Sequence, residues 1–140
     1  MGRILAIDYG MRRTGIAVSD PLRIIAGALT TVETRQLEKF LADYFSKNDV
    51  DTIVLGKPVQ MNGSPSETMR YIEPLAARLR RTYPDKDVVL YDERFTSVLA
   101  HRTMIESGMG RMARRDKAVV DRISAAIILQ SYMESLSMRR

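Results

Sequence analysis

The chain has 140 residues, which predicts one domain spanning residues 1–140 with a single hydrophobic core. It has no cysteine, which excludes disulfides, thiolate zinc sites and a cysteine nucleophile and fits a reducing, cytoplasmic location. With 22 Lys and Arg against 17 Asp and Glu, its net charge of +5 favours a polyanionic partner such as nucleic acid, and no stretch is apolar enough to predict membrane association.

The first part of the chain predicts three consecutive strands. Apolar runs at residues 4–7, 14–19 and 24–32 are typical of buried or half-buried strands. A short turn at residues 9–13 separates the first two runs, and Asp20 before Pro21 predicts a second turn. Because these connections are short, we expect the three strands to pair antiparallel.

The rest of the chain predicts alternating helices and strands. Leu37, Phe40, Leu41, Tyr44 and Phe45 share one face of a helix, and later helices are predicted at residues 66–81, at 97–106 and from 116 or 117 to about 136. Strands are predicted at 52–56 and 88–91, and Pro74 predicts a kink or a broken start in its helix. Strands separated by helices should be parallel, so we expect an α/β fold with a mixed five-stranded sheet and helices on both faces.

Three acidic residues lie where a carboxylate is costly unless it is paired, hydrogen-bonded or bound to a metal. Asp8 ends the first strand, Glu93 follows the strand at 88–91, and Asp121 lies inside the apolar pattern of the last helix. The carboxyl ends of parallel strands meet at one edge of a sheet, and the small Ala125 and Ala126 would let the last helix approach it. Together the three acids predict a pocket for Mg²⁺ or Mn²⁺, one or two ions, with Asp8 as the bridging ligand.

Each acid alone is also explained by an ordinary local contact. The local partners would be Gly10 for Asp8, Arg94 or Arg12 for Glu93, and Arg122 or Lys117 for Asp121. Asp92 should point to the opposite face from Glu93, because side chains alternate along a strand. The pocket is therefore a prediction about the three acids as a set.

Several segments together resemble the YqgF family, also called RuvX, whose members are Holliday-junction-resolvase-like proteins with an RNase H fold. The segments are AIDYG at 6–10, RTGIAVSD at 13–20, LGKP at 55–58 with Gly63, DERFTS at 92–97, and DRISAAIILQ at 121–130 with Lys117. The resemblance spans nearly the whole chain. It implies an RNase H-like fold and a nuclease linked in bacteria to maturation of the 5′ end of 16S ribosomal RNA, and in some members to cleavage of four-way DNA junctions.

The resemblance also implies roles for individual residues. Asp8, Glu93 and Asp121 match the acidic motif positions, and Lys117 matches a basic position suited to contact the scissile phosphate. Arg13, Arg94 and Thr96 match neighbouring positions that would hold the site or the nucleic-acid backbone. A fourth carboxylate, frequent in related RNase H-fold nucleases, would be Asp92 or Asp116. The charge pattern separately predicts nucleic-acid contacts from Arg12, Arg111, Arg114 and Arg115.

The leading hypothesis is a metal-dependent endonuclease that acts on structured RNA, with pre-16S rRNA the favoured substrate. One alternative is a Holliday junction resolvase, which normally needs a two-fold dimer for two symmetric cuts. Another is a non-catalytic nucleic-acid-binding factor that uses the basic loop at residues 111–117. An actin-like ATP-binding unit would need two such domains, more than 140 residues supply. The sequence leaves monomer and homodimer open.

Overall fold

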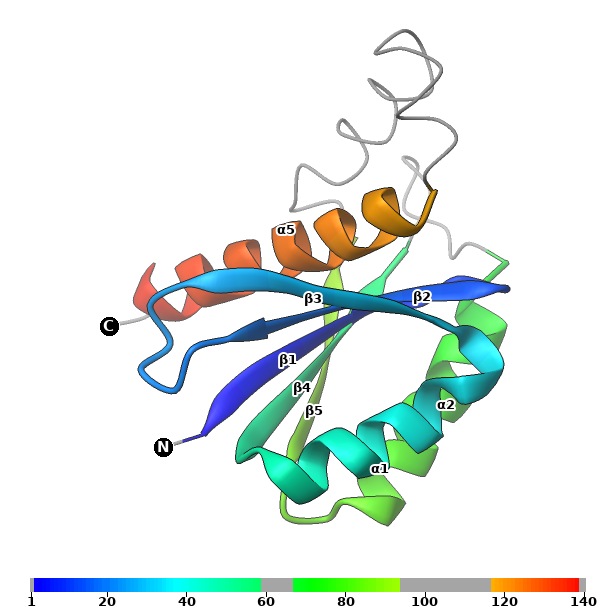
Figure 1. Cartoon of the computed structure of the whole chain (residues 1–140), viewed down its shortest axis with the longest axis horizontal. Coiled ribbons are helices and arrows are strands. Elements are labelled where there is room, and N and C mark those ends of the chain that lie inside the picture. Colours follow the sequence, from blue (N-terminus) through cyan, green and yellow to red (C-terminus); the bar gives the residue numbers. More distant parts are fainter. Residues whose placement is uncertain (1, 59–66, 94–116, 139–140) are drawn as a thin grey trace, which may run out of the picture.

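The computed structural model describes residues 2–58, 67–93 and 117–138, with the backbone alone for 117–122 and 137–138 (Figure 1). The elements in chain order are β1 (Arg3–Asp8), β2 (Arg13–Ser19), β3 (Ala26–Glu33), the 3-10 helix η1 (Thr34–Gln36), α1 (Leu37–Lys47), β4 (Val50–Lys57), α2 (Met69–Thr82), β5 (Asp87–Asp92) and α5 (Lys117–Met138). The helix predicted at 97–106 and the basic loop after it lie outside the described residues.

All five strands form one mixed sheet in the order β3-β2-β1-β4-β5. β1 pairs antiparallel with β2, and β2 with β3, whereas β1 with β4 and β4 with β5 are parallel pairs. This arrangement confirms the predicted mixture of three antiparallel strands followed by parallel ones. It also makes β1, the strand that ends in Asp8, the centre of the sheet.

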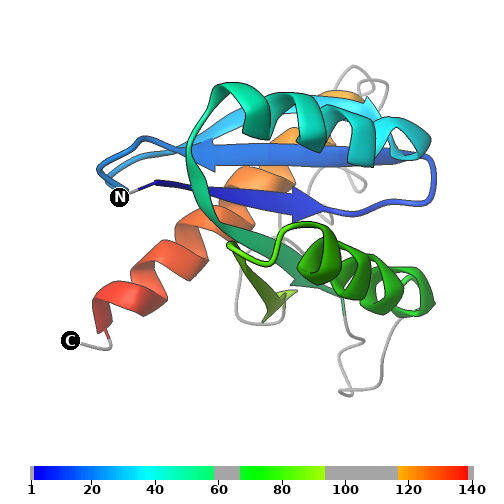
Figure 2. The ribbon, with the colours of Figure 1, turned by 90° about the horizontal axis from the view of Figure 1, so that it is seen from below.

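Helices cover both faces of the sheet, as predicted (Figures 1 and 2). Alternating residues of β1 supply both cores: Leu5 and Ile7 pack in the core beneath α1 and α2, whereas Ile4 and Ala6 pack beneath α5. This period of two follows from the pleat of a strand. Residues two positions apart therefore share a face of the sheet wherever the strand has no bulge; the pairing shifts register at Arg3/Ile4 and at Ile16/Ala17.

The two helices of the first face follow the predicted apolar spacing. α1 buries Leu37 and Leu41, and α2 buries all five residues predicted to point inward: Met69, Ile72, Leu75, Ala76 and Leu79. α2 begins at Met69 rather than at residue 66 and continues through Pro74. Pro74 is only the sixth residue of the helix, so its missing N–H removes a single hydrogen bond near the start. No helix in the described ranges is long and apolar enough to cross a membrane.

The turn between β2 and β3 is built by Asp20, as predicted. Its carboxylate accepts hydrogen bonds from the backbone N–H groups of Ile24 and Ile25 at 2.7 and 2.8 Å. These bonds, the Ile25 bond foremost, lower the pKa of Asp20 from its ordinary value of 3.8. They also fold residues 24 and 25 into the turn, which is why β3 starts at Ala26 and not at residue 24.

Candidate carboxylate site at the sheet edge

Asp8 is buried, with 5% of its surface exposed, at the carboxyl end of the central strand. Asp8 follows Ala6 by two residues on β1, so it lies on the same face of the sheet as Ile4 and Ala6, the face that α5 covers. Its partner on β2 is Gly15, and the register of Ile7 with Leu55 places Gly56 beside it on β4. Both sheet neighbours of Asp8 therefore lack a side chain, so other groups can approach the backbone on either side of this carboxylate.

Glu93 is also buried, with 2% exposed, directly after β5. A Cβ added to Gly56 would lie 3.3 Å from Glu93 Oε2 and 3.4 Å from Glu93 Cδ. The Glu93 carboxyl group therefore lies over Gly56, the β4 residue next to Asp8. The structure thus brings these two predicted acids to one edge of the sheet across a glycine.

Helix α5 closes one side of this site. The same added Cβ on Gly56 would lie 2.7 Å from Cδ1 of Ile128, so the helix side chain packs directly on the glycine. Ala125, one turn earlier, is fully buried against the sheet. This confirms that small residues allow a close approach of the last helix.

The remaining predicted acid lies on the amino-terminal part of α5. Asp121 is seven residues, about two turns, before Ile128, and this end of the helix lies toward the carboxyl ends of the parallel strands (Figure 1). The side chains of Asp121 and Lys117 lie outside the described residues. Their convergence with Asp8 and Glu93 stays a prediction, and Arg94, Thr96, Arg111, Arg114, Arg115 and Asp116 also lie outside the described part.

Asp92 does not join the site. It pairs with Lys57 on β4 and follows Leu90 by two residues on β5. Leu90 packs in the core beneath α1 and α2. Asp92 therefore lies on the other face of the sheet from Glu93, as strand alternation predicted. It is not placed to serve as a fourth carboxylate.

The donors that are described suit a hard cation. Asp8 and Glu93 offer carboxylate oxygens, the ligands preferred by Mg²⁺ and Mn²⁺, on either side of Gly56. Within the described residues no three acidic or histidine side chains cluster, since the third predicted acid, Asp121, has no described side chain. The site fits a divalent cation in the kind of donor it presents.

The loop after Asp8 is fastened to the start of η1 by Thr34. Thr34 Oγ1 donates to the Gly10 carbonyl at 2.6 Å and lies 2.9 Å from Thr14 Oγ1, and the Thr34 N–H donates to the Arg12 carbonyl at 2.9 Å. A Cβ on Gly10 would collide with the carbonyl oxygen of Arg13, so the loop closes on itself tightly. Local sequence patterns give no sign of this role of Thr34, because its partners are about 20 residues away along the chain.

Comparison with known families identifies the chain. Residues 2–135 match the RuvX family, described as Holliday junction resolvase. The chain belongs to the RuvX family. This confirms the resemblance drawn from the sequence motifs, and the sheet order and its parallel and antiparallel pairs agree with the RNase H-like fold expected for that family.

RuvX relatives cover almost the whole chain. A protein of Porphyromonas gingivalis is 56% identical over 135 residues, 96% of this chain and 98% of the relative. Relatives in Bacteroides thetaiotaomicron and Flavobacterium johnsoniae are 55% and 48% identical over the same length, again covering 96% of this chain and 98% of each relative. All three carry the name "Putative pre-16S rRNA nuclease". Among solved structures, YeaZ from Pseudomonas aeruginosa aligns with 77% of this chain and 50% of its own, with a TM-score of 0.43 and 20% identity.

Proposed function

We propose that this RuvX protein is a metal-dependent endonuclease that cuts phosphodiester bonds in the maturation of the 5′ end of pre-16S rRNA. The observation that carries the proposal is the pair of buried carboxylates, Asp8 and Glu93, gathered around Gly56 at one edge of the sheet. Two buried carboxylates close together repel each other when both are ionised, and a bound cation would offset that repulsion. The names of relatives at 48–56% identity support the choice of substrate.

Each residue of the site has a part in this chemistry. Asp8, at the end of the central strand, and Glu93, directly after the edge strand, would hold the cation. A bound Mg²⁺ or Mn²⁺ supplies activation of water and stabilisation of charge at phosphorus. Ile128 excludes bulk water from one side, which strengthens electrostatic interactions within the site. Asp121 would be the third acidic ligand and Lys117 would contact the scissile phosphate.

A second candidate function is cleavage of four-way DNA junctions. The description of the matched family as Holliday junction resolvase favours it. Two symmetric cuts need two sites related by a two-fold axis, so this activity requires a homodimer. Sedimentation of the protein alone and with a four-way junction distinguishes a dimeric resolvase from a monomeric ribonuclease.

The experiment compares two substrates under identical conditions. Wild-type protein and the Asp8→Asn variant are incubated with an RNA that spans the 5′ end of pre-16S rRNA, and in parallel with a four-way DNA junction, each with Mg²⁺, with Mn²⁺ or with a chelator. We expect cutting of the RNA by the wild type alone, and only with a metal. Cutting of the junction alone would replace the ribonuclease by the resolvase, and cutting by Asp8→Asn would remove Asp8 from the mechanism.

A further inference from the structure

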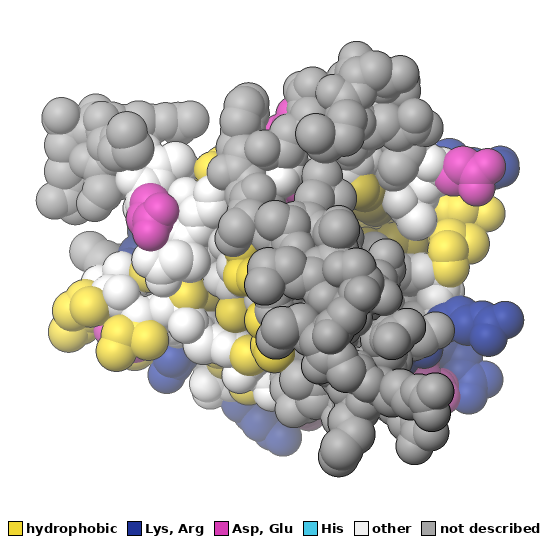
Figure 3. All heavy atoms as spheres, turned by 90° about the horizontal axis from the view of Figure 1, so that it is seen from above, with side chains coloured by type: hydrophobic (Ala, Val, Ile, Leu, Met, Phe, Trp, Pro, Cys, Tyr) yellow, Lys and Arg dark blue, Asp and Glu magenta, His cyan; other side chains and the backbone are white. Residues whose placement is uncertain are grey.

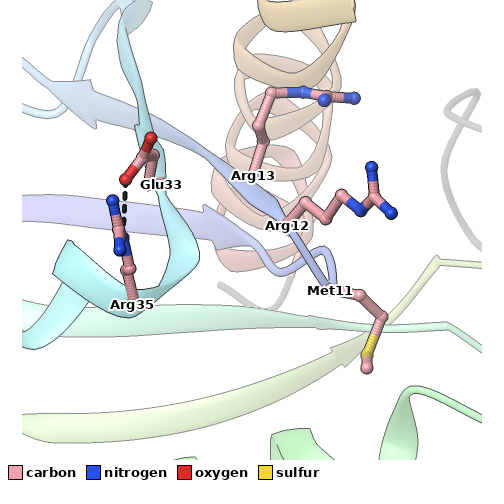
Figure 4. Close-up of a pocket in the computed structure, with 5 residues that line it drawn as sticks. All are labelled: Met11, Arg12, Arg13, Glu33 and Arg35. Carbon is pink, nitrogen blue, oxygen red and sulfur yellow. Dashed lines mark hydrogen bonds and ion pairs between the residues drawn. The ribbon is translucent and has the colours of Figure 1, made fainter.

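A groove rich in arginine lies beside the carboxylate site. Met11, Arg12, Arg13, Glu33 and Arg35 line it, and its volume is about 490 Å³. Figure 4 shows Arg12 and Arg13 extending to one side and the Glu33–Arg35 pair on the other. Lys and Arg side chains gather at this end of the molecule in the space-filling view (Figure 3). We call these five residues the arginine groove.

The sheet register ties the arginine groove to Asp8. Asp8 pairs with Gly15, and two residues farther along β2, Arg13 pairs with Glu33 on β3. Arg13 is two residues from Gly15 on β2, and Glu33 is the partner of Arg13 on β3. Both residues therefore lie on the same face of the sheet as Asp8. Two residues along a strand and one strand across give a Cα separation of about 8 Å between Asp8 and Arg13.

The arginine groove is also held in a fixed place. The three hydrogen bonds of Thr34 join the loop that carries Met11 and Arg12 to the segment that carries Glu33 and Arg35. Both walls of the groove therefore keep their position relative to Asp8. A binding surface that is already ordered loses less conformational entropy when its ligand binds.

The charges of the groove suit a phosphate backbone. The groove is lined by three arginines and one glutamate, and the planar guanidinium donates two parallel hydrogen bonds to a phosphate. The pair between Arg35 Nε and Glu33 Oε2, at 2.8 Å, is exposed on both sides, with 79% and 60% of the side chains in solvent. Such a pair contributes little to stability, so a phosphate can replace Glu33 as the partner of Arg35 at low cost.

We propose that the arginine groove binds the sugar–phosphate backbone of the substrate strand next to the scissile bond, and that Arg35 is a nucleic-acid-binding residue. The proposal rests on the proposed function, since it takes the substrate to be a nucleic acid cut at Asp8 and Glu93. The Cα separation of about 8 Å between Asp8 and Arg13 places the groove within a few nucleotides of the scissile bond. The groove would thus fix where the strand crosses the carboxylates.

The first test measures binding without cleavage. Single-stranded RNA, and DNA of the same sequence, are titrated by fluorescence anisotropy in chelator between 50 and 200 mM salt against wild type, the double variant Arg12→Gln/Arg35→Gln, and Arg78→Gln. Arg78 is a matched control, because it also forms an exposed pair, with Glu38 at 3.2 Å, but on the opposite side of the sheet. Melting temperatures establish that each variant is folded.

The expected result follows from counterion release. Losing two phosphate contacts lowers the slope of log K against log salt by about 1.4, because each contact on a single strand contributes roughly 0.7. Over this fourfold range of salt the wild type should therefore lose about sevenfold more affinity than the double variant. Arg78→Gln should keep the wild-type slope, and Glu33→Gln, which removes the repelling carboxylate, should bind more tightly than wild type.

Two results would overturn the proposal. One is an unchanged slope in the double variant, and the other is an equal fall in Arg78→Gln, which would mean that any exposed arginine acts alike. If the slope falls equally with RNA and with DNA, the contact is to the backbone, as proposed. A fall with DNA alone would contradict an RNA substrate. Because binding is measured in chelator, a failure to cut RNA would contradict the proposed function and leave this result standing.

Discussion

Gly56 lies where the site and the core meet, so Gly56→Ala should disturb both. The new Cβ would lie 2.7 Å from Ile128 Cδ1 and 3.3 Å from Glu93 Oε2. Carbon atoms in contact normally stay about 3.5–4.0 Å apart, so the end of the Ile128 side chain must move by about 1 Å. The Glu93 carboxyl group must move by a few tenths of an ångström in the same substitution.

The size of the effect follows from these two displacements. The moving methyl is the far end of a side chain, but Ile128 is fully buried, so we expect a loss of about 1–2 kcal/mol in the free energy of unfolding. For a chain of this length that lowers the melting temperature by about 3–8 °C. Displacing Glu93, a proposed metal ligand, should reduce cleavage by about tenfold, because a shift of about 1 Å at a reacting centre costs about a hundredfold.

The assay uses two companion variants. Gly27→Ala is the control for adding a methyl group to a strand glycine, because its Cβ would meet only the Val18 carbonyl oxygen, at an ordinary 3.7 Å. Ile128→Val removes the colliding Cδ1 and alone should cost about 0.5–1.5 kcal/mol. In the Gly56→Ala/Ile128→Val double variant the losses in stability should be less than additive, by about 1 kcal/mol.

The second substitution should affect stability and cleavage differently. The double variant should be about as stable as Gly56→Ala, although it also lacks Cδ1, and it should not regain activity, because the contact with Glu93 persists. Urea unfolding and RNA cleavage rates measure the two quantities on the same preparations. If Gly56→Ala matched Gly27→Ala in both measurements, or if the double variant regained full activity, the placement of Glu93 over Gly56 would be wrong.

Three more predictions concern other parts of the chain. Thr34→Val removes the hydroxyl that bonds the Gly10 carbonyl and should cost about 1 kcal/mol in urea unfolding; an unchanged midpoint would refute the fastening of the loop. The lowered pKa of Asp20 means that its stabilisation is complete above pH 3.8 and is lost as pH falls through the folded pKa, so melting temperatures of wild type and Asp20→Ala should converge in acid and differ at neutral pH. Neutralising Arg111, Arg114 and Arg115 together should weaken binding to all sequences alike and flatten its salt dependence; an effect on one sequence only would mean that the loop reads bases.

Local patterns were enough to predict most of the fold. The faces of α1 and α2 could be predicted because apolar spacing along a helix directly reports which residues are buried, as Ile72 and Leu79 illustrate. The start of β3 could not, because Ile24 and Ile25 are apolar and read as strand residues. In the structure both are 67% exposed, since the Asp20 side chain holds their backbone N–H groups in a turn.

The candidate site was predicted in part. That Asp8 and Glu93 share an edge follows from the rule that parallel strands end together. That Gly15 and Gly56 flank Asp8 depends on strand register, which is set by pairing between residues far apart in the sequence. The same holds for Arg35, which reaches the arginine groove only because β3 pairs with β2.

The most direct test of the account compares two neighbouring acids on opposite faces of the sheet. Glu93→Gln and Asp92→Asn each remove one negative charge, at two adjacent residues. The rate at which each variant cleaves the RNA spanning the 5′ end of pre-16S rRNA is measured with Mn²⁺ and compared with the rates of the wild type and Asp8→Asn. The account predicts that Glu93→Gln and Asp8→Asn abolish cutting without a lower melting temperature in chelator, whereas Asp92→Asn still cuts. Cutting by Glu93→Gln at the wild-type rate, or equal losses in Glu93→Gln and Asp92→Asn, would contradict a catalytic centre built on the α5 face.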